Sequence, residues 1–208
     1  MSKALCCYAF ESLINKLNKE SPKISLSSFQ KQLGEKSNDI PTDAPLFITW
    51  NKNSNLRGCI GTFQSLNIES GVSKYALIAA LQDPRFPEIS SRELPSLSVS
   101  VTLLDNFKPI KNQLDWEIGK NGLKVSFNLN HEHYSGTFLP SVAEDEKWDK
   151  LTTLYYLLRK ADYSIDKKSV DKFYTKGLEE GWLKLTRYDG LKSGLSFKEF
   201  KEIRDELN

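Results

Sequence analysis

The chain has 208 residues, of which 39% are hydrophobic and 11% aromatic, so it can bury a sizeable core without metals or disulfides. Its 29 basic and 27 acidic residues leave a net charge of only +2, so the chain as a whole exerts no strong electrostatic attraction on nucleic acid or a membrane surface. No run approaches the ~18 apolar residues of a membrane span, and no secretory signal is recognisable. Three cysteines without metal or disulfide spacing indicate free thiols in a reducing compartment, and we expect a cytoplasmic or nuclear location.

The first third of the chain predicts two helices and a loop. One face of an amphipathic helix is expected to bury apolar residues at helical spacing, namely Cys6, Phe10, Leu13, Ile14 and Leu17. A second, short helix is expected from about Ser27 to Gly34. Residues 35–45 are polar and interrupted by proline, which predicts a mobile loop.

Residues 56–63 read Leu-Arg-Gly-Cys-Ile-Gly-Thr-Phe, and this octet is the most informative segment of the chain. With residues 46–50 it predicts a β-hairpin whose second arm is irregular. Glycine weakens a strand, so two glycines predict a bulge or the close approach of another group. Alternation along the strand would place one set of side chains on a common face: Arg57, Cys59, Gly61 and Phe63.

An apolar helix is predicted over residues 72–81, buried on most sides. It must end at the sequence Asp83-Pro84-Arg85-Phe86-Pro87, because two prolines prevent its continuation. Arg85 therefore lies in a rigid connection, and Phe86 is interpreted as a core side chain.

The second half of the chain alternates apolar and polar residues at 97–103 and 123–129, which predicts antiparallel strands wetted on one face, with a return strand at 134–139. A long helix is expected from about Glu146, with Trp148, Leu151, Tyr155 and Leu158 facing inward. A strand over 182–188 and a terminal helix from Ser196 follow. Helices interspersed among antiparallel strands define the class as α+β.

These segments together resemble one family, the AMMECR family. The octet matches its most characteristic motif, and further segments match in order: Asp83 with 85–87, 93–95, 114–116, 139–143, 157–160 and 185–188. The resemblance covers nearly the whole chain and implies a single α+β domain, residues 1–208, with a mainly antiparallel sheet, flanking helices and two lobes of unequal size. It implies no assigned reaction, although a functional association with Memo-type or radical-SAM-type partners follows from the family. Residues 166–181 are longer and more charged than the corresponding family segment and are interpreted as a variable insertion.

Cys59 is a candidate nucleophile, since a neighbouring arginine would favour its thiolate. Acyl-transfer chemistry also requires a base, and the only histidines, His131 and His133, fall in a predicted hairpin turn. The alternative is that Cys59 is a small buried apolar residue. Arg57 and Arg85 could form an anion site, or each could fix a loop by bonding backbone carbonyls or a carboxylate such as Asp83.

No metal is expected, because the cysteines and histidines lack a recognised ligand spacing, and no motif implies a cofactor. Basic and acidic residues alternate in the second half of the chain, which argues against nucleic acid. The sequence therefore favours a regulatory or scaffold protein that binds an unidentified protein partner or a small anionic ligand. The expected lining of that site is Arg57, Gly58, Cys59, Gly61, Asp83, Arg85 and Phe86. The alternative is an enzyme, or an enzyme subunit, that modifies a small molecule or RNA with Cys59, Arg57 and Arg85.

Overall fold

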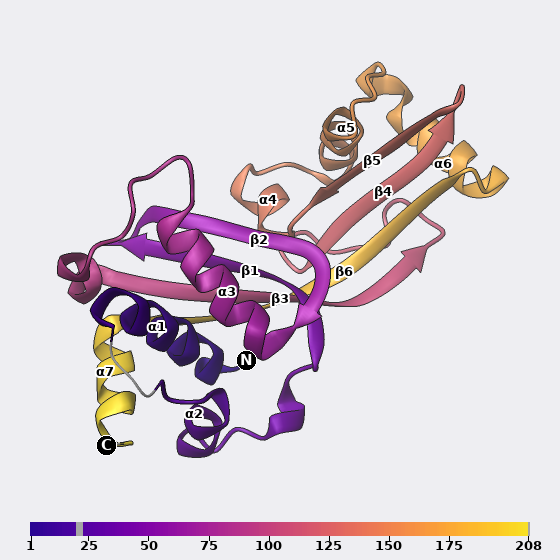
Figure 1. Cartoon of the computed structure of the whole chain (residues 1–208). Coiled ribbons are helices and arrows are strands. Elements are labelled where there is room, and N and C mark those ends of the chain that lie inside the picture. The colour runs from indigo at the N-terminus through magenta and orange to yellow at the C-terminus, as the bar shows by residue number, and fades with distance from the viewer. Residues whose placement is uncertain (20–22, 208) are drawn as a thin grey trace. The chain divides into compact units, whose positions relative to one another are not determined.

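The computed structural model describes residues 1–19 and 23–207 and confirms the α+β class (Figure 1). Six strands form one mainly antiparallel sheet in the order β2-β1-β3-β6-β4-β5. The strands are β1 (Asp43–Lys52), β2 (Asn55–Asn67), β3 (Leu97–Ile110), β4 (Asn121–Leu129), β5 (Glu132–Phe138) and β6 (Leu183–Ser196). Because β2 lies at one end of this order, the octet belongs to an edge strand.

The chain divides into two compact units, which are the two unequal lobes that the family resemblance implies. Unit 1 comprises Met1–Leu103 and Leu191–Asn208, and unit 2 comprises Leu104–Gly190. Each unit has its own hydrophobic core.

Unit 1 packs helices on the strands β1 and β2. They are α1 (Lys3–Asn18), α2 (Leu26–Gln32), α3 (Ile68–Leu81) and α7 (Phe197–Asp205), with short 3₁₀ turns at Ser37–Asp39 and Ser91–Ser96. α1 begins where the Ser2 hydroxyl accepts a hydrogen bond from the Leu5 amide, as expected of an N-cap. Its buried face includes Cys6, as the periodicity predicts. Trp50 anchors the core, because its indole N–H donates to the Ala76 carbonyl at 3.0 Å.

Unit 2 packs α4 (Pro140–Asp145), α5 (Lys150–Lys160) and α6 (Val170–Glu180) around β4, β5 and the first part of β6, with a 3₁₀ turn at Lys167–Ser169. Phe127 of β4 lies at the centre of an aromatic cluster with Tyr134, Tyr163, Phe173 and Trp182. The predicted strands at 97–103, 123–129, 134–139 and 182–188 and the terminal helix are all confirmed.

The helix predicted from about Glu146 is present as α5, but it begins later, at Lys150. A separate short helix, α4, ends at Asp145, and Asp149 caps α5 by accepting a hydrogen bond from the Thr152 amide at 2.7 Å. Trp148 therefore precedes α5, and Leu151 is exposed rather than inward. Residues 166–181, which the sequence left without structure, form the last 3₁₀ turn and α6. Their variability, and the mobility of residues 35–45, stay predictions.

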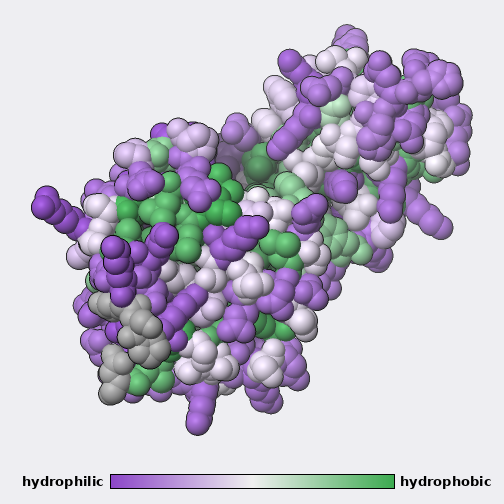
Figure 2. Space-filling view, viewed as in Figure 1, coloured by the Kyte–Doolittle hydropathy of each residue, from purple (hydrophilic) through white to green (hydrophobic). Residues whose placement is uncertain are grey.

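The helix predicted over 72–81 is confirmed as α3, but it is less buried than its composition suggests. Val72, Ala76 and Ala79 are buried, whereas Ile78 and Leu81 are half-buried. Figure 2 shows hydrophobic side chains gathered on the surface over α3. Among the described residues, no helix is both long and apolar enough to cross a membrane.

Candidate functional site

The octet occupies the first part of β2, where it pairs with β1. Cys59 lies opposite Thr49 and Gly61 lies opposite Phe47, so these side chains share a face as the alternation predicts. The Phe63 ring extends this face, with its centroid 5.0 Å from that of Phe47. The hairpin prediction is therefore confirmed.

The two glycines of the octet are required by close packing. A Cβ atom on Gly58 would lie 2.1 Å from the Ala79 carbonyl oxygen, so α3 can approach β2 only over a residue without a side chain. A Cβ atom on Gly61 would lie 2.4 Å from both the Phe47 ring and the Leu46 carbonyl oxygen. Both glycines thus have a structural reason independent of any ligand.

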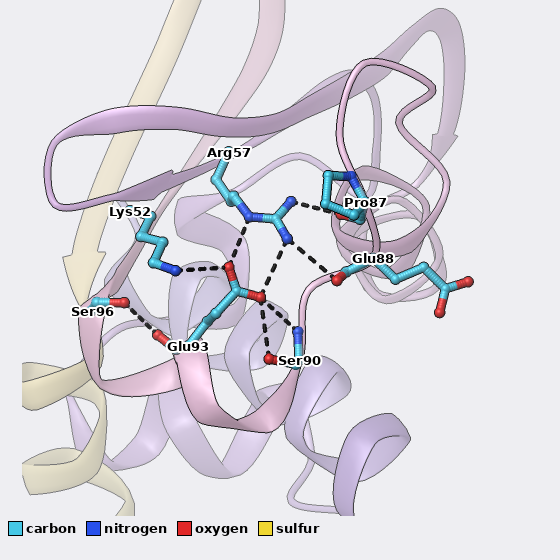
Figure 3. A network of polar contacts seen from close by, with 7 residues as sticks. All are labelled: Lys52, Arg57, Pro87, Glu88, Ser90, Glu93 and Ser96. Atoms are coloured by element: carbon cyan, nitrogen blue, oxygen red, sulfur yellow. Dashed lines mark hydrogen bonds and ion pairs between the residues drawn. The ribbon is translucent and has the colours of Figure 1, made fainter.

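Arg57 is held in a buried polar network rather than open to solvent (Figure 3). Its Nε and Nη2 atoms donate to the two carboxylate oxygens of Glu93 at 2.9 and 3.2 Å. Nη1 donates to the Pro87 carbonyl at 2.7 Å, and Nη2 also donates to the Glu88 carbonyl at 3.3 Å. The guanidinium therefore ties β2 to the connection that follows α3, which matches the loop-fixing interpretation of this arginine.

Glu93 gathers donors from three directions. Besides Arg57, its carboxylate accepts from the Lys52 ammonium at 3.1 Å and from the Ser90 amide at 2.8 Å. Burial by itself would raise the pKa of this carboxyl, but the hydrogen bonds from Arg57, Ser90 and Lys52 outweigh burial and lower the pKa to about 2. Glu93 is therefore ionised in the folded protein at neutral pH and stabilises the segment around Arg57.

Asp83 and Arg85 cover the outer edge of β2 at Cys59. The Asp83 carboxylate accepts from the Cys59 amide at 3.0 Å, and the Arg85 Nη2 atom donates to the Cys59 carbonyl at 3.2 Å. Arg85 also donates from Nε and Nη2 to the two Asp83 oxygens, at 3.0 and 2.7 Å. These bonds from Arg85, with that from the Cys59 amide, hold the pKa of Asp83 well below its usual range. The pair protects an edge strand that would otherwise offer unpaired backbone groups.

The two arginines of the candidate site differ in accessibility. The Arg85 side chain is 54% exposed, and its Nη1 atom has no acceptor within the described part of the chain, whereas Arg57 is buried with all three nitrogens engaged. It is also Arg85, rather than Arg57, that contacts Cys59. Phe86 is only half-buried, so its interpretation as a core residue is wrong. The buried side chain of this connection is Ile89, and the Arg85 guanidinium lies 5.5 Å from the Phe86 ring centre.

The Cys59 thiol is half-buried and lies 3.1 Å from the Thr49 hydroxyl. His131 lies in the β4–β5 turn and His133 in β5, where its ring contacts Asn128, so both belong to unit 2. Unit 1 therefore supplies no histidine to act as a base for this thiol. Within residues 1–19 and 23–207, no group of three or more His, Cys, Asp or Glu side chains is arranged to hold a metal ion.

A hollow of about 590 Å³ lies within unit 2, and reasoning from sequence did not identify it. Its wall includes Asp115 and Trp116 from one family-matching segment and Arg187 from another. Both segments had thus been noted for their match to the family, but no feature of the sequence near either of them indicated that they lie side by side in the fold.

The fold and the octet define an α+β protein with a glycine-containing edge strand tied down by two arginine–carboxylate pairs. The AMMECR1 family model matches residues 6–177, and the chain belongs to this family. It is 37% identical to the uncharacterized protein YOR289W of Saccharomyces cerevisiae, with 98% of this chain and 90% of the relative covered. It is 35% identical to the uncharacterized protein At2g38710 of Arabidopsis thaliana, over 78% of this chain and 74% of the relative.

A crystal structure of the uncharacterized protein PH0010 from Pyrococcus horikoshii has a similar fold. The TM-score is 0.60, and the match covers 91% of this chain and 89% of that one at 23% identity. At this level of identity the likeness supports the fold alone. None of these relatives' names assigns an activity to the family.

Proposed function

We propose that the chain is a regulatory or scaffold module without catalytic activity of its own, which binds a carboxylate or phosphate group of a ligand or protein partner at Arg85. The observation that supports this proposal is the state of the Arg85 guanidinium, which is oriented by Asp83 and by the Cys59 carbonyl yet is half exposed. A guanidinium fixed in this way loses little conformational freedom when it binds a planar or tetrahedral anion. Asp83 offsets part of its charge, so we expect weak binding of a free anion and added contacts from a larger partner.

The surroundings of the octet favour binding over catalysis. Arg57 is committed to Glu93 and to two backbone carbonyls, so it is not available to a substrate. The Asp83 carboxylate already accepts from Cys59 and Arg85, and its lowered pKa makes it a poor general base. Around the thiol, the hydrogen-bond partner is the Thr49 hydroxyl, which does not remove a proton near neutral pH.

The test is a titration of the isotopically labelled chain with inorganic phosphate and citrate, followed in ¹H–¹⁵N NMR spectra. We expect saturable shifts of the Cys59 and Arg85 amides, weakened in Arg85→Lys, which keeps a cation beside Asp83 but lacks the planar fork. Arg92→Lys makes the same substitution at another exposed arginine of unit 1 and should leave the shifts unchanged. Equal shifts in wild type and Arg85→Lys would contradict the proposal.

The alternative, an enzyme or enzyme subunit acting on a small molecule or RNA through Cys59, rests on the half-buried state of that thiol. Iodoacetamide labelling across pH separates the two functions. Fast labelling with a midpoint well below the ordinary thiol value of about 8.5 would favour the enzyme. Slow labelling, together with full retention of cellular function in Cys59→Ser, would favour the binding module.

A further inference from the structure

We propose that unit 2 carries a second binding site, independent of Arg85, for a small anion that contains a flat aromatic ring. The site is the hollow of about 590 Å³ described above, a volume within the range of small-molecule pockets. Its wall is built from the end of β3, the connection between β3 and β4, the first residues of β4 and α5, and the middle of β6. All of these residues belong to unit 2, so the site is complete within one compact body.

The wall of the hollow is fixed by hydrogen bonds before any ligand binds. The Arg187 Nη1 atom donates to the Asp115 carboxylate at 2.9 Å and to its backbone carbonyl at 2.8 Å. The two Asp189 oxygens accept from the side-chain amides of Asn106 and Asn121, at 2.9 and 2.8 Å. Side chains locked in this way form a pre-organised site, because little entropy is lost when a ligand enters.

Charge points to an anionic ligand. Four basic and three acidic side chains line the hollow, and two of the acids, Asp115 and Asp189, already accept hydrogen bonds from the wall itself. The Nε and Nη2 atoms of Arg187, and the ammonium groups of Lys108 and Lys120, have no acceptor among the residues that the structure describes. The unused hydrogen-bonding capacity is therefore mostly that of cationic donors, which bind phosphate or carboxylate.

An exposed aromatic ring supplies the second element of recognition. Phe107 lines the hollow and is 47% exposed, while its ring stacks on the buried Tyr188 ring with centroids 5.0 Å apart and planes 28° apart. Tyr188 is itself fixed, since its hydroxyl donates to the Phe138 carbonyl at 2.8 Å. The supported Phe107 ring is a platform on which a flat ligand ring can stack, and covering it removes apolar surface from water.

The experiment uses three probes on the full chain at constant ionic strength: 5′-AMP, which has both a ring and a phosphate, adenosine, which lacks the phosphate, and ribose 5-phosphate, which lacks the ring. We expect 5′-AMP to shift the amide resonances of residues around the hollow and to bind at least tenfold more tightly than either fragment. The double variant Lys108→Gln/Lys120→Gln should weaken 5′-AMP binding by about tenfold. Its matched control, Lys124→Gln/Lys172→Gln, removes the same charge from exposed lysines of unit 2 outside the hollow and should change the affinity less than twofold.

Neither lysine of the test variant makes a hydrogen bond or ion pair within the described part of the chain, so its fold should be retained. The proposal is overturned if 5′-AMP causes no saturable shift at the hollow, if adenosine binds equally well, or if test and control variants lose affinity equally. Arg85→Lys should leave the shifts that 5′-AMP causes around the hollow unchanged, so this site and the one at Arg85 can fail separately.

Discussion

Glu93→Gln should destabilise unit 1 in a manner that depends on pH. The pKa of Glu93 falls from an ordinary value of 4.5 to about 2 in the folded protein, and each tenfold change in proton affinity is worth about 1.4 kcal/mol. The full difference corresponds to about 3 kcal/mol, which solvent at the edge of the network reduces to about 2 kcal/mol. Because folding lowers this pKa, the stabilisation is complete above pH 4.5 and is lost as the pH falls toward 2.

The gap in unfolding free energy between wild type and Glu93→Gln should therefore be about 2 kcal/mol at pH 6.5 and less than half of that near pH 3. Urea titrations followed by ¹⁹F NMR of fluorotryptophan-labelled protein measure it, since Trp50 is the one tryptophan in unit 1. Glu88→Gln is the matched control, because Glu88 joins the network only through its backbone carbonyl and its side chain points away from Arg57 (Figure 3). A gap that stays constant with pH, or an equal effect of the control, would refute the role assigned to the Arg57–Glu93 pair.

Two further outcomes follow from packing and burial. Gly58→Ala should lower the unfolding free energy by about 1–3 kcal/mol or more, because the new methyl group would clash with the backbone of α3. Gly194→Ala is the control. Its methyl group would make only ordinary contacts at 3.7 Å, so the unfolding free energy should change by no more than about 0.5 kcal/mol. Equal costs in urea unfolding would contradict this explanation. Iodoacetamide at pH 8 should modify only Cys59 in the native protein, because burial raises the pKa of the Cys6 thiol to about 11 and that of Cys7 to about 12. Modification of more than one thiol before unfolding, measured by mass spectrometry, would show that this burial is wrong.

Features set by neighbouring residues were predictable from the sequence. Alternation placed Cys59 and Phe63 on one face of a strand because successive side chains of any strand point to opposite sides. The Asp83–Arg85 pair was also accessible to this reasoning, since the two residues are two positions apart in a turn fixed by prolines. The start of α5 was placed too early, although Asp149, three residues before Thr152, carries an N-cap signal.

Long-range partners could not be predicted in the same way. Glu93 lies 36 residues from Arg57, and several carboxylates were equally plausible partners until the chain was folded. The hollow in unit 2 depends on pairs still further apart, since Asp115 and Arg187 are separated by 72 residues. The periodicity of apolar residues carries no information about such long-range contacts. It specifies which face of a helix or strand a residue occupies, but not which other segment packs against that face.

The long-range contacts of the octet, which the sequence did not reveal, change how its residues are interpreted. Gly58 is explained by the approach of α3, and Arg57 by its ion pair with the half-buried Glu93, so neither residue needs a ligand to account for its presence. A functional role is better sought in side chains that folding does not explain. In unit 1 these include the half-exposed Arg85 and the Phe63 ring, which is 48% exposed on an edge strand. Since an exposed aromatic ring and an oriented guanidinium are both common in binding surfaces, they favour recognition over chemistry at this edge.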